Sequence, residues 1–339
     1  MSGITGQGTT FDLPNFTGEL FSVTPQDTPF LSSIGGLTGG RSVNGDPLIS
    51  WQYYDLRDAE SDRQRVEGGS VDPEQRVRRT DHNVVEIHQE AVELSYTKQA
   101  AVNQVAGSGS AHPHGGSLSG SNPVQDEMAW QLRAQLVQKA RDIEVSFLTG
   151  TFANPASNAT PRRTRGLVAA IERGVVDADD NTEKANVVDG GGADLTEEVL
   201  LNALQEAWEN GGLMIDETRT AIVNAYQKRK LTEVFITDKG YAETTRDVGG
   251  VHVSVIETDF GRVNIMLNRH ASTDQVVVAS LEQCVPRFLE IPGKGHFFVE
   301  PLAKSGASDE AQLYGEVGLE YGNPIAHALI DNLEDGSGS

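Results

Sequence analysis

The feature that most constrains this chain is a charged segment, residues 55–81, which has almost no side chains that could form a core. From Arg57 to Asp81 it carries six Arg and seven Asp or Glu residues, and such a composition cannot fold alone. It lies between PLISWQYY (47–54) and HNVVEIHQEAVEL (82–94), which are rich in β-forming residues. The pattern predicts a two-stranded excursion over residues 41–98. Its tip is either a solvated loop or a contact with a neighbouring subunit.

Two groups of arginines are candidates for contacts between subunits. In the charged segment the two signs of charge are interleaved, so Arg57, Arg63, Arg76 and Arg79 could meet carboxylates on neighbours. A second basic cluster contains Arg162, Arg163 and Arg165. A nucleic-acid contact is conceivable there, but the cluster holds no aromatic residue on which a base could stack. In so acidic a chain, carboxylates of another subunit are the favoured partners.

A long amphipathic helix is predicted over residues 122–150. Asn122 is a good N-cap, Pro123 suits the first helical position, and Thr149-Gly150 ends the helix. At ~1.5 Å per residue its length would be roughly 40 Å. Residues at helical spacing form one apolar stripe that could brace a sheet: Met128, Leu132, Leu136, Ala140, Ile143 and Phe147.

The remaining segments predict a mixture of helices and strands. Residues 1–40 form an extended arm, and residues 106–122 a Gly/Ser linker. The arm's large apolar residues indicate that it lies on a surface; they are Phe11, Leu13, Phe16, Leu20, Phe21, Phe30 and Leu31. Two helices are predicted after the long helix: one with Asp194 and Glu197 as a capping box and a Gly-Gly stop, and one over 225–235. A hairpin over 251–269, a strand at QVVVASL and two longer strands within 295–322 follow. The fold class is α+β.

Composition excludes several classes of protein. The 339 residues include 27 Lys or Arg against 49 Asp or Glu, a net charge of −22. That balance excludes a nucleic-acid-binding polycation. The hydrophobic share of 37% excludes global disorder. No apolar run approaches the ~18 residues of a membrane helix. The first basic residue is Arg41, so we expect no secretory signal and synthesis in the cytosol.

Catalytic and metal-binding motifs are absent from the sequence. There is no P-loop, G-x-G-x-x-G, H-E-x-x-H or G-x-S-x-G pattern. Asp259-Phe260-Gly261 matches a kinase tripeptide but falls at the turn of the predicted hairpin. His112 and His114 stand in the linker, where a solvated pair is favoured over a metal site. The single cysteine, Cys284, is predicted to be a small buried hydrophobe. We therefore predict that the protein is not an enzyme, with no catalytic residue, cofactor or metal.

Several segments, in order, resemble a known family. They are TPFLSSIG (28–35), the strand end Trp51–Asp55, EGG (67–69), the long helix ending in FLTG, PRRTRGL (161–167), the hairpin over 251–269, and residues 300–333. Together they resemble the major capsid proteins, or major head proteins, of tailed bacteriophages with the Hong Kong 97 fold. The resemblance covers most of the chain.

The resemblance implies a domain organisation. Residues 1–40 would be the N-terminal arm and 41–98 the extended loop. Residues 99–175 and 286–339 would form the peripheral domain, including a spine helix at 122–150, and residues 176–285 the axial domain. The arm shows no coiled-coil-like stretch, so scaffolding is expected to be a separate protein.

The resemblance also implies a function: self-assembly into hexamers and pentamers of an icosahedral bacteriophage head that encloses double-stranded DNA. The expected partners are the chain itself, a scaffolding protein, a portal, and DNA bound without sequence specificity, with or without a decoration protein. No membrane is involved. The expected location is the virion, after assembly in the host bacterial cytoplasm. Two alternatives stay open: an encapsulin-like nanocompartment shell, and an acidic hydrolase with dispersed carboxylates.

Overall fold

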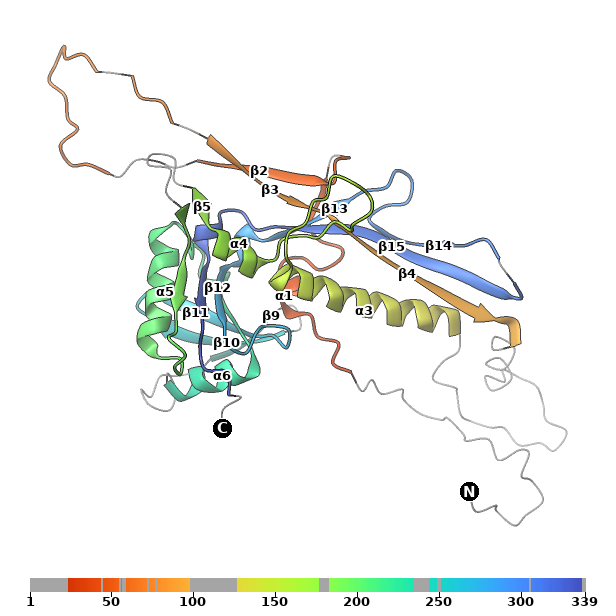
Figure 1. The fold of residues 1–339 in the computed structure, drawn as a ribbon. Coiled ribbons are helices and arrows are strands. Elements are labelled where there is room, and N and C mark those ends of the chain that lie inside the picture. Colours follow the sequence, from red (N-terminus) through yellow and green to blue (C-terminus); the bar gives the residue numbers. More distant parts are fainter. Residues whose placement is uncertain are drawn as a thin grey trace. The chain divides into compact units, whose positions relative to one another are not determined.

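The computed structural model describes most of the chain outside the N-terminus and the linker (Figure 1). The described residues are 24–43, 45–54, 56, 59–71, 73–76, 78–97, 127–176, 183–234, 244–248, 251–304 and 306–336. Contacts divide the chain into two compact units. The smaller unit comprises Met1–Gln26, Gln89–Gln138 and Val299–Leu313, and the larger unit comprises Asp27–His88, Lys139–Phe298 and Tyr314–Ser339.

The larger unit is built on a seven-stranded mixed sheet in the order β7-β16-β12-β8-β11-β10-β9. Its strands are β7 (Val187–Asp189), β8 (Arg219–Val223), β9 (Thr244–Val248), β10 (Val251–Thr258), β11 (Gly261–Leu267), β12 (Val276–Ser280) and β16 (Ala328–Asp331). The predicted hairpin is confirmed: β10 and β11 pair antiparallel from Val253↔Met266 to Thr258↔Gly261. Gly261 has φ +90°, a conformation that suits a tight turn at Asp259-Phe260. The strand predicted at QVVVASL is β12.

Each face of this sheet contributes to a different core, because successive strand residues point to opposite faces. On β8, Ala221 and Val223 belong to a core with α5 (Glu197–Glu209) and α6 (Ala225–Leu231). Ile222 belongs to a core with α1 (Pro29–Ser33), α3 (Glu127–Thr149) and α4 (Leu167–Arg173). The central strand β8 is therefore buried on both faces.

The predicted capping box at the start of α5 is wrong. The N-cap is Thr196, whose hydroxyl accepts a hydrogen bond from the Val199 amide at 3.3 Å. Asp194 instead binds Lys230 Nζ at 2.7 Å. The predicted Gly-Gly stop is confirmed, since α5 ends at Glu209 just before Gly211-Gly212. The helix predicted over 225–235 is α6, and residue 235 lies outside the described residues.

The predicted long helix is α3, and only its C-terminal end is buried. It ends at Thr149 as predicted, and residues 122–126 lie outside the described residues. Of the predicted stripe, Ile143 and Phe147 are fully buried, whereas Leu136 is 38% exposed. The predicted stripe therefore lies on the correct face of the helix, but its buried part is shorter than predicted. The reason is that this core contacts only the last turns of the helix.

A five-stranded sheet contains the long strands near the C-terminus. Its order is β1-β13-β15-β14, with β4 also paired to β15. The strands are β1 (Arg41–Val43), β4 (Glu86–Ser95), β13 (Val285–Leu289), β14 (Phe297–Pro301) and β15 (Ser308–Glu320). The two longer strands predicted within 295–322 are thus β14 and β15. Cys284, just before β13, is 3% exposed, and burial raises the pKa of its thiol, which confirms a buried residue.

The predicted two-stranded excursion is present as β2 (Leu48–Tyr54) and β3 (Arg78–Val84). They pair antiparallel from Leu48↔Val84 to Tyr54↔Arg78. The second predicted strand is interrupted at Val85, so its remainder is β4. The minor elements are the strand pair β5 (Val175–Val176) and β6 (Glu183–Lys184), and the short helices η2 (Leu281–Gln283) and η3 (Pro324–Ala326).

Candidate assembly surfaces

The tip of the β2–β3 excursion, residues 55–77, is held together by its own ion pairs; we call it the extended loop. Arg63 lies 2.5 Å from Glu74 and 3.2 Å from Glu60, and Arg76 lies 3.2 Å from Glu74. Each exposed pair is worth only ~0–1 kcal/mol, so the pairs shape the loop more than they stabilise the fold. The loop therefore supplies acidic partners for Arg63 and Arg76. Arg57 lies outside the described residues, and the inter-subunit roles of these arginines and of Arg79 stay a prediction.

The root of the extended loop is fixed by a buried charge, Asp81 on β3. Its carboxylate is fully buried, lies 2.7 Å from Arg173 Nη1, and accepts a hydrogen bond from the Tyr321 hydroxyl at 3.1 Å. Burial, together with the charge of Asp81, raises the pKa of Tyr321 to about 12. Opposite Asp81, Trp51 Nε1 donates to the Gly322 carbonyl at 2.7 Å. Both strands of the root are therefore tied to the end of β15.

The basic cluster at 162–165 is mainly a structural clamp within the chain. Asn83 exchanges two hydrogen bonds with the backbone of Arg165, at 2.7 and 3.0 Å. The Arg165 guanidinium lies 4.4 Å from the centre of the Phe152 ring and donates to the Tyr321 hydroxyl, and the residue is 7% exposed. Arg162 pairs with Glu316 at 2.8 Å.

These contacts add partners within the chain, and the contact of the cluster with another subunit stays a prediction. For Arg162 and Arg165 the partner is internal. Arg163 is exposed, and its backbone forms a bridge with Ala153. The inter-subunit role of its side chain also stays a prediction.

The last part of the N-terminal arm is anchored by a buried carboxylate. Glu144 on α3 is fully buried and accepts hydrogen bonds from the amides of Phe30 and Leu31, at 2.9 and 2.6 Å, and from Asn268 at 2.5 Å. Burial raises the pKa of Glu144. Phe30 and Leu31 are fully buried, as predicted for the arm. The other residues expected to hold the arm on a surface, Phe11, Leu13, Phe16, Leu20 and Phe21, lie outside the described residues.

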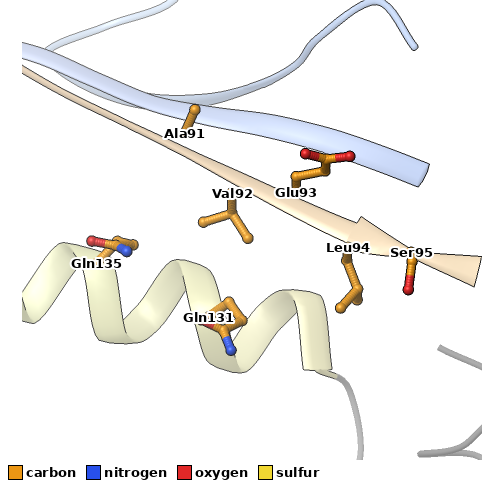
Figure 2. Close-up of a pocket in the computed structure, with 7 residues that line it drawn as sticks. All are labelled: Ala91, Val92, Glu93, Leu94, Ser95, Gln131 and Gln135. Atoms are coloured by element: carbon orange, nitrogen blue, oxygen red, sulfur yellow. The ribbon is translucent and has the colours of Figure 1, made fainter. Parts of the chain in front are cut away.

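A crevice of about 440 Å³ separates β4 from α3 in the smaller unit. Figure 2 shows Val92 and Leu94 on the strand, with Gln131 and Gln135 on the helix. Glu93 is the one ionisable residue that lines it. The other polar residues that line it, Ser95, Gln131 and Gln135, are neutral.

The described part of the chain also bears on metal sites and membrane spans. No group of three His, Cys, Asp or Glu residues there could hold a metal. Among the described helices, none is long and apolar enough to cross a membrane. The pair His112 and His114 lies outside the described residues, so the sequence interpretation of that pair is untested.

An anchored arm, a braced extended loop and a long helix define a structural subunit that acts through contacts with other subunits. The chain belongs to the SU10 major capsid protein family, whose model matches residues 3–334. It is therefore a major capsid protein and a component of the virion. No curated protein sequence matches it.

Solved structures share the fold at low sequence identity. The capsid of cyanophage A-1(L) matches with a TM-score of 0.65 and 12% identity, over 93% of this chain and 95% of that one. The capsid of cyanophage P-SCSP1u matches with a TM-score of 0.59 and 11% identity, over 96% and 95%. An encapsulin complex from Synechococcus elongatus PCC 7942 matches with a TM-score of 0.57 and 11% identity, over 96% and 94%. These matches confirm the α+β capsid fold of the Hong Kong 97 type.

Sequence reasoning missed Asp81 and Glu144. Glu144 had a signal, since it lies between the apolar positions Ile143 and Phe147. Asp81 had none, because a charge at the end of a charged segment is ordinarily solvated.

Proposed function

We propose that this chain forms the hexamers and pentamers of an icosahedral bacteriophage head around double-stranded DNA, and that its role is structural, without catalysis. The family match over residues 3–334 carries the proposal. We also propose a separate scaffolding protein, a portal, and assembly in the host cytoplasm, with or without a decoration protein. A net charge of −22 supports this role, because a mostly acidic wall would not trap the incoming DNA.

The encapsulin-like shell is the second candidate, and the fold shared with an encapsulin complex favours it. The two proposals differ in what the shell contains. Native particles should be isolated, treated with nuclease and then opened. Protected double-stranded DNA of uniform length supports the phage head, and a protein cargo without DNA supports the nanocompartment.

We keep the predicted domains with one revision. Residues 1–40 form the arm, 41–98 the extended-loop region and 99–175 part of the peripheral domain. The axial domain, predicted as 176–285, also takes in β16, because this strand pairs with both β7 and β12. The peripheral domain, predicted to include 286–339, then no longer includes β16.

Shell formation should depend on the extended loop. Replacing Leu56–Arg76 with a short Gly/Ser turn leaves β2 and β3 intact, so the isolated subunit should keep its circular dichroism spectrum and thermal midpoint. Closed shells should be lost, because symmetry repeats each loop contact around the particle. Negative-stain electron microscopy measures the outcome. Normal particles from this variant would refute the proposed role of the loop.

The mature shell should not be covalently cross-linked. In the type member of the fold, a lysine of the extended loop is joined to an asparagine of a neighbouring subunit. Here the loop carries arginines, which stay protonated and are poor nucleophiles, and the first lysine is Lys98. Lys304 bonds to Asp309 and to the Tyr96 hydroxyl, which raises the pKa of its ammonium group and disfavours attack. Mature heads boiled in reducing detergent should run near 36.5 kDa, and a ladder of oligomers would contradict this.

A further inference from the structure

Exposed apolar side chains occur at the C-terminal end of α5 and in the loop that follows it, near the half-buried Phe260. Trp208 is 54% exposed, and Met214 and Ile215, a few residues further on, are 71% and 49% exposed. The Trp208 ring lies 6.4 Å from the ring of Phe260 at the β10–β11 turn. We call these four residues the Trp208 patch. Single exposed apolar residues are ordinary, but a group of them marks an interaction site.

The Trp208 patch is held in place from beneath. Arg219 donates from Nη1 to the Phe260 carbonyl at 2.7 Å and from Nε to the Leu213 carbonyl, so one side chain ties both loops together. Leu213 is fully buried and has φ +56°, a left-handed conformation that is unfavourable for a residue with a side chain. Such a conformation persists only where its surroundings enforce it. Met214 and Ile215 are therefore presented outward by a pre-organised loop.

Acidic residues adjoin the patch residues along the chain. They are all exposed: Glu209, Asp216, Glu217, Glu257 and Asp259. An apolar centre with a charged rim is the arrangement of a protein–protein interface. Asp216 already pairs with Arg219 at 2.7 Å and Glu257 with Arg262 at 3.1 Å. The remaining negative charge, at Asp259 among others, favours a partner that carries a cation beside an apolar group.

The tip of the extended loop has these two properties. Val66 is 80% exposed and starts a turn in which the Gly69 amide donates to the Val66 carbonyl at 3.1 Å. Arg65, beside it, is exposed and has no ion-pair partner among the described residues. The pair between Arg63 and Glu74 ties the two limbs of the loop below the turn. The loop thus presents one cation and one aliphatic side chain on a braced turn.

We propose that the Arg65-Val66 turn of one copy docks on the Trp208 patch of a second copy. Val66 packs against the apolar centre, and Arg65 pairs with the rim at Asp259. Because each copy carries both surfaces, the contact is head-to-tail and can close a ring. The inference rests on the proposed function, since it requires assembled shells.

Disulfide trapping tests the contact. Cys284 is buried, so it does not interfere. Particles should be assembled from Val66→Cys/Ile215→Cys and from Val66→Cys/Met214→Cys, oxidised mildly, and run on a non-reducing gel. A disulfide forms only when the two Cα atoms are within about 7 Å. We expect linked oligomers from at least one pair. The matched control is Val66→Cys/Val187→Cys, because Val187 is 39% exposed on β7, outside the patch, and should stay monomeric.

A charge exchange keeps the inference testable if the cysteine variants do not assemble. Arg65→Glu should reduce the yield of closed particles by at least about tenfold, since it places two negative charges together. Adding Asp259→Lys should restore most of the yield. Particles without disulfides in either patch pair, linkage through Val187, or normal assembly of Arg65→Glu would overturn the inference. Failure of the unaltered chain to form shells would instead overturn the proposed function.

Discussion

Replacing Asp81 with alanine should destabilise the isolated subunit by about 3–5 kcal/mol, the usual cost of removing one partner from a buried ion pair. The carboxylate is fully buried between Arg173 at 2.7 Å and the Tyr321 hydroxyl at 3.1 Å, with Arg165 at 3.8 Å. Without it, Arg173 and the Tyr321 hydroxyl lose a hydrogen-bond acceptor, and the buried Arg165 guanidinium loses the negative charge beside it. Urea unfolding of the subunit before assembly measures the free energy.

The matched control is Asp142→Ala on α3. Asp142 also pairs with a cation, Lys139 at 3.1 Å, but its side chain is 40% exposed. Its removal should cost at most ~1 kcal/mol. Asp81→Asn should fall between the two, because the amide keeps the shape and one acceptor but loses the charge. Equal unfolding curves for the two alanine variants would show that Asp81 does not hold the root of the extended loop.

The sequence predicted those features whose interacting residues lie close together along the chain. The β10–β11 hairpin was predictable because its turn and both strands lie within nineteen residues, 251–269. The end of α3 at Gly150 was predictable for the same reason. By contrast, Glu144 caps the amides of Phe30 and Leu31, which are 114 and 113 positions away. No local pattern specifies such a partner.

A local sequence pattern also gave a wrong prediction where one of its residues binds a residue that is distant in the sequence. Asp194 and Thr196 both suit the start of α5, and Lys230 binds Asp194 and leaves Thr196 as the cap. The role of the basic cluster at 162–165 was predicted from its charge alone. The hydrogen bonds between Asn83 and the Arg165 backbone, which fold that segment onto β3, involve residues 82 positions apart.

The second large effect on subunit stability is expected in the long helix α3, where two residues of the apolar stripe differ in burial. Phe147→Ala should cost about 3–5 kcal/mol, because a fully buried aromatic ring is lost from the core that also holds Phe30 and Leu167. Leu136→Ala, at a position 38% exposed, should cost less than about 1 kcal/mol in the isolated subunit, since little apolar area returns to water.

Alanine favours helix at both positions, so helix propensity does not explain the expected difference between these two variants. Urea unfolding of both, at the same subunit concentration and below the threshold for assembly, gives the comparison. Coincident curves would mean that the core extends along the whole stripe. A large separation would show that the helix is anchored at its C-terminal end, beside Glu144 and the arm. Its N-terminal stripe would then be free to differ in sequence without loss of subunit stability.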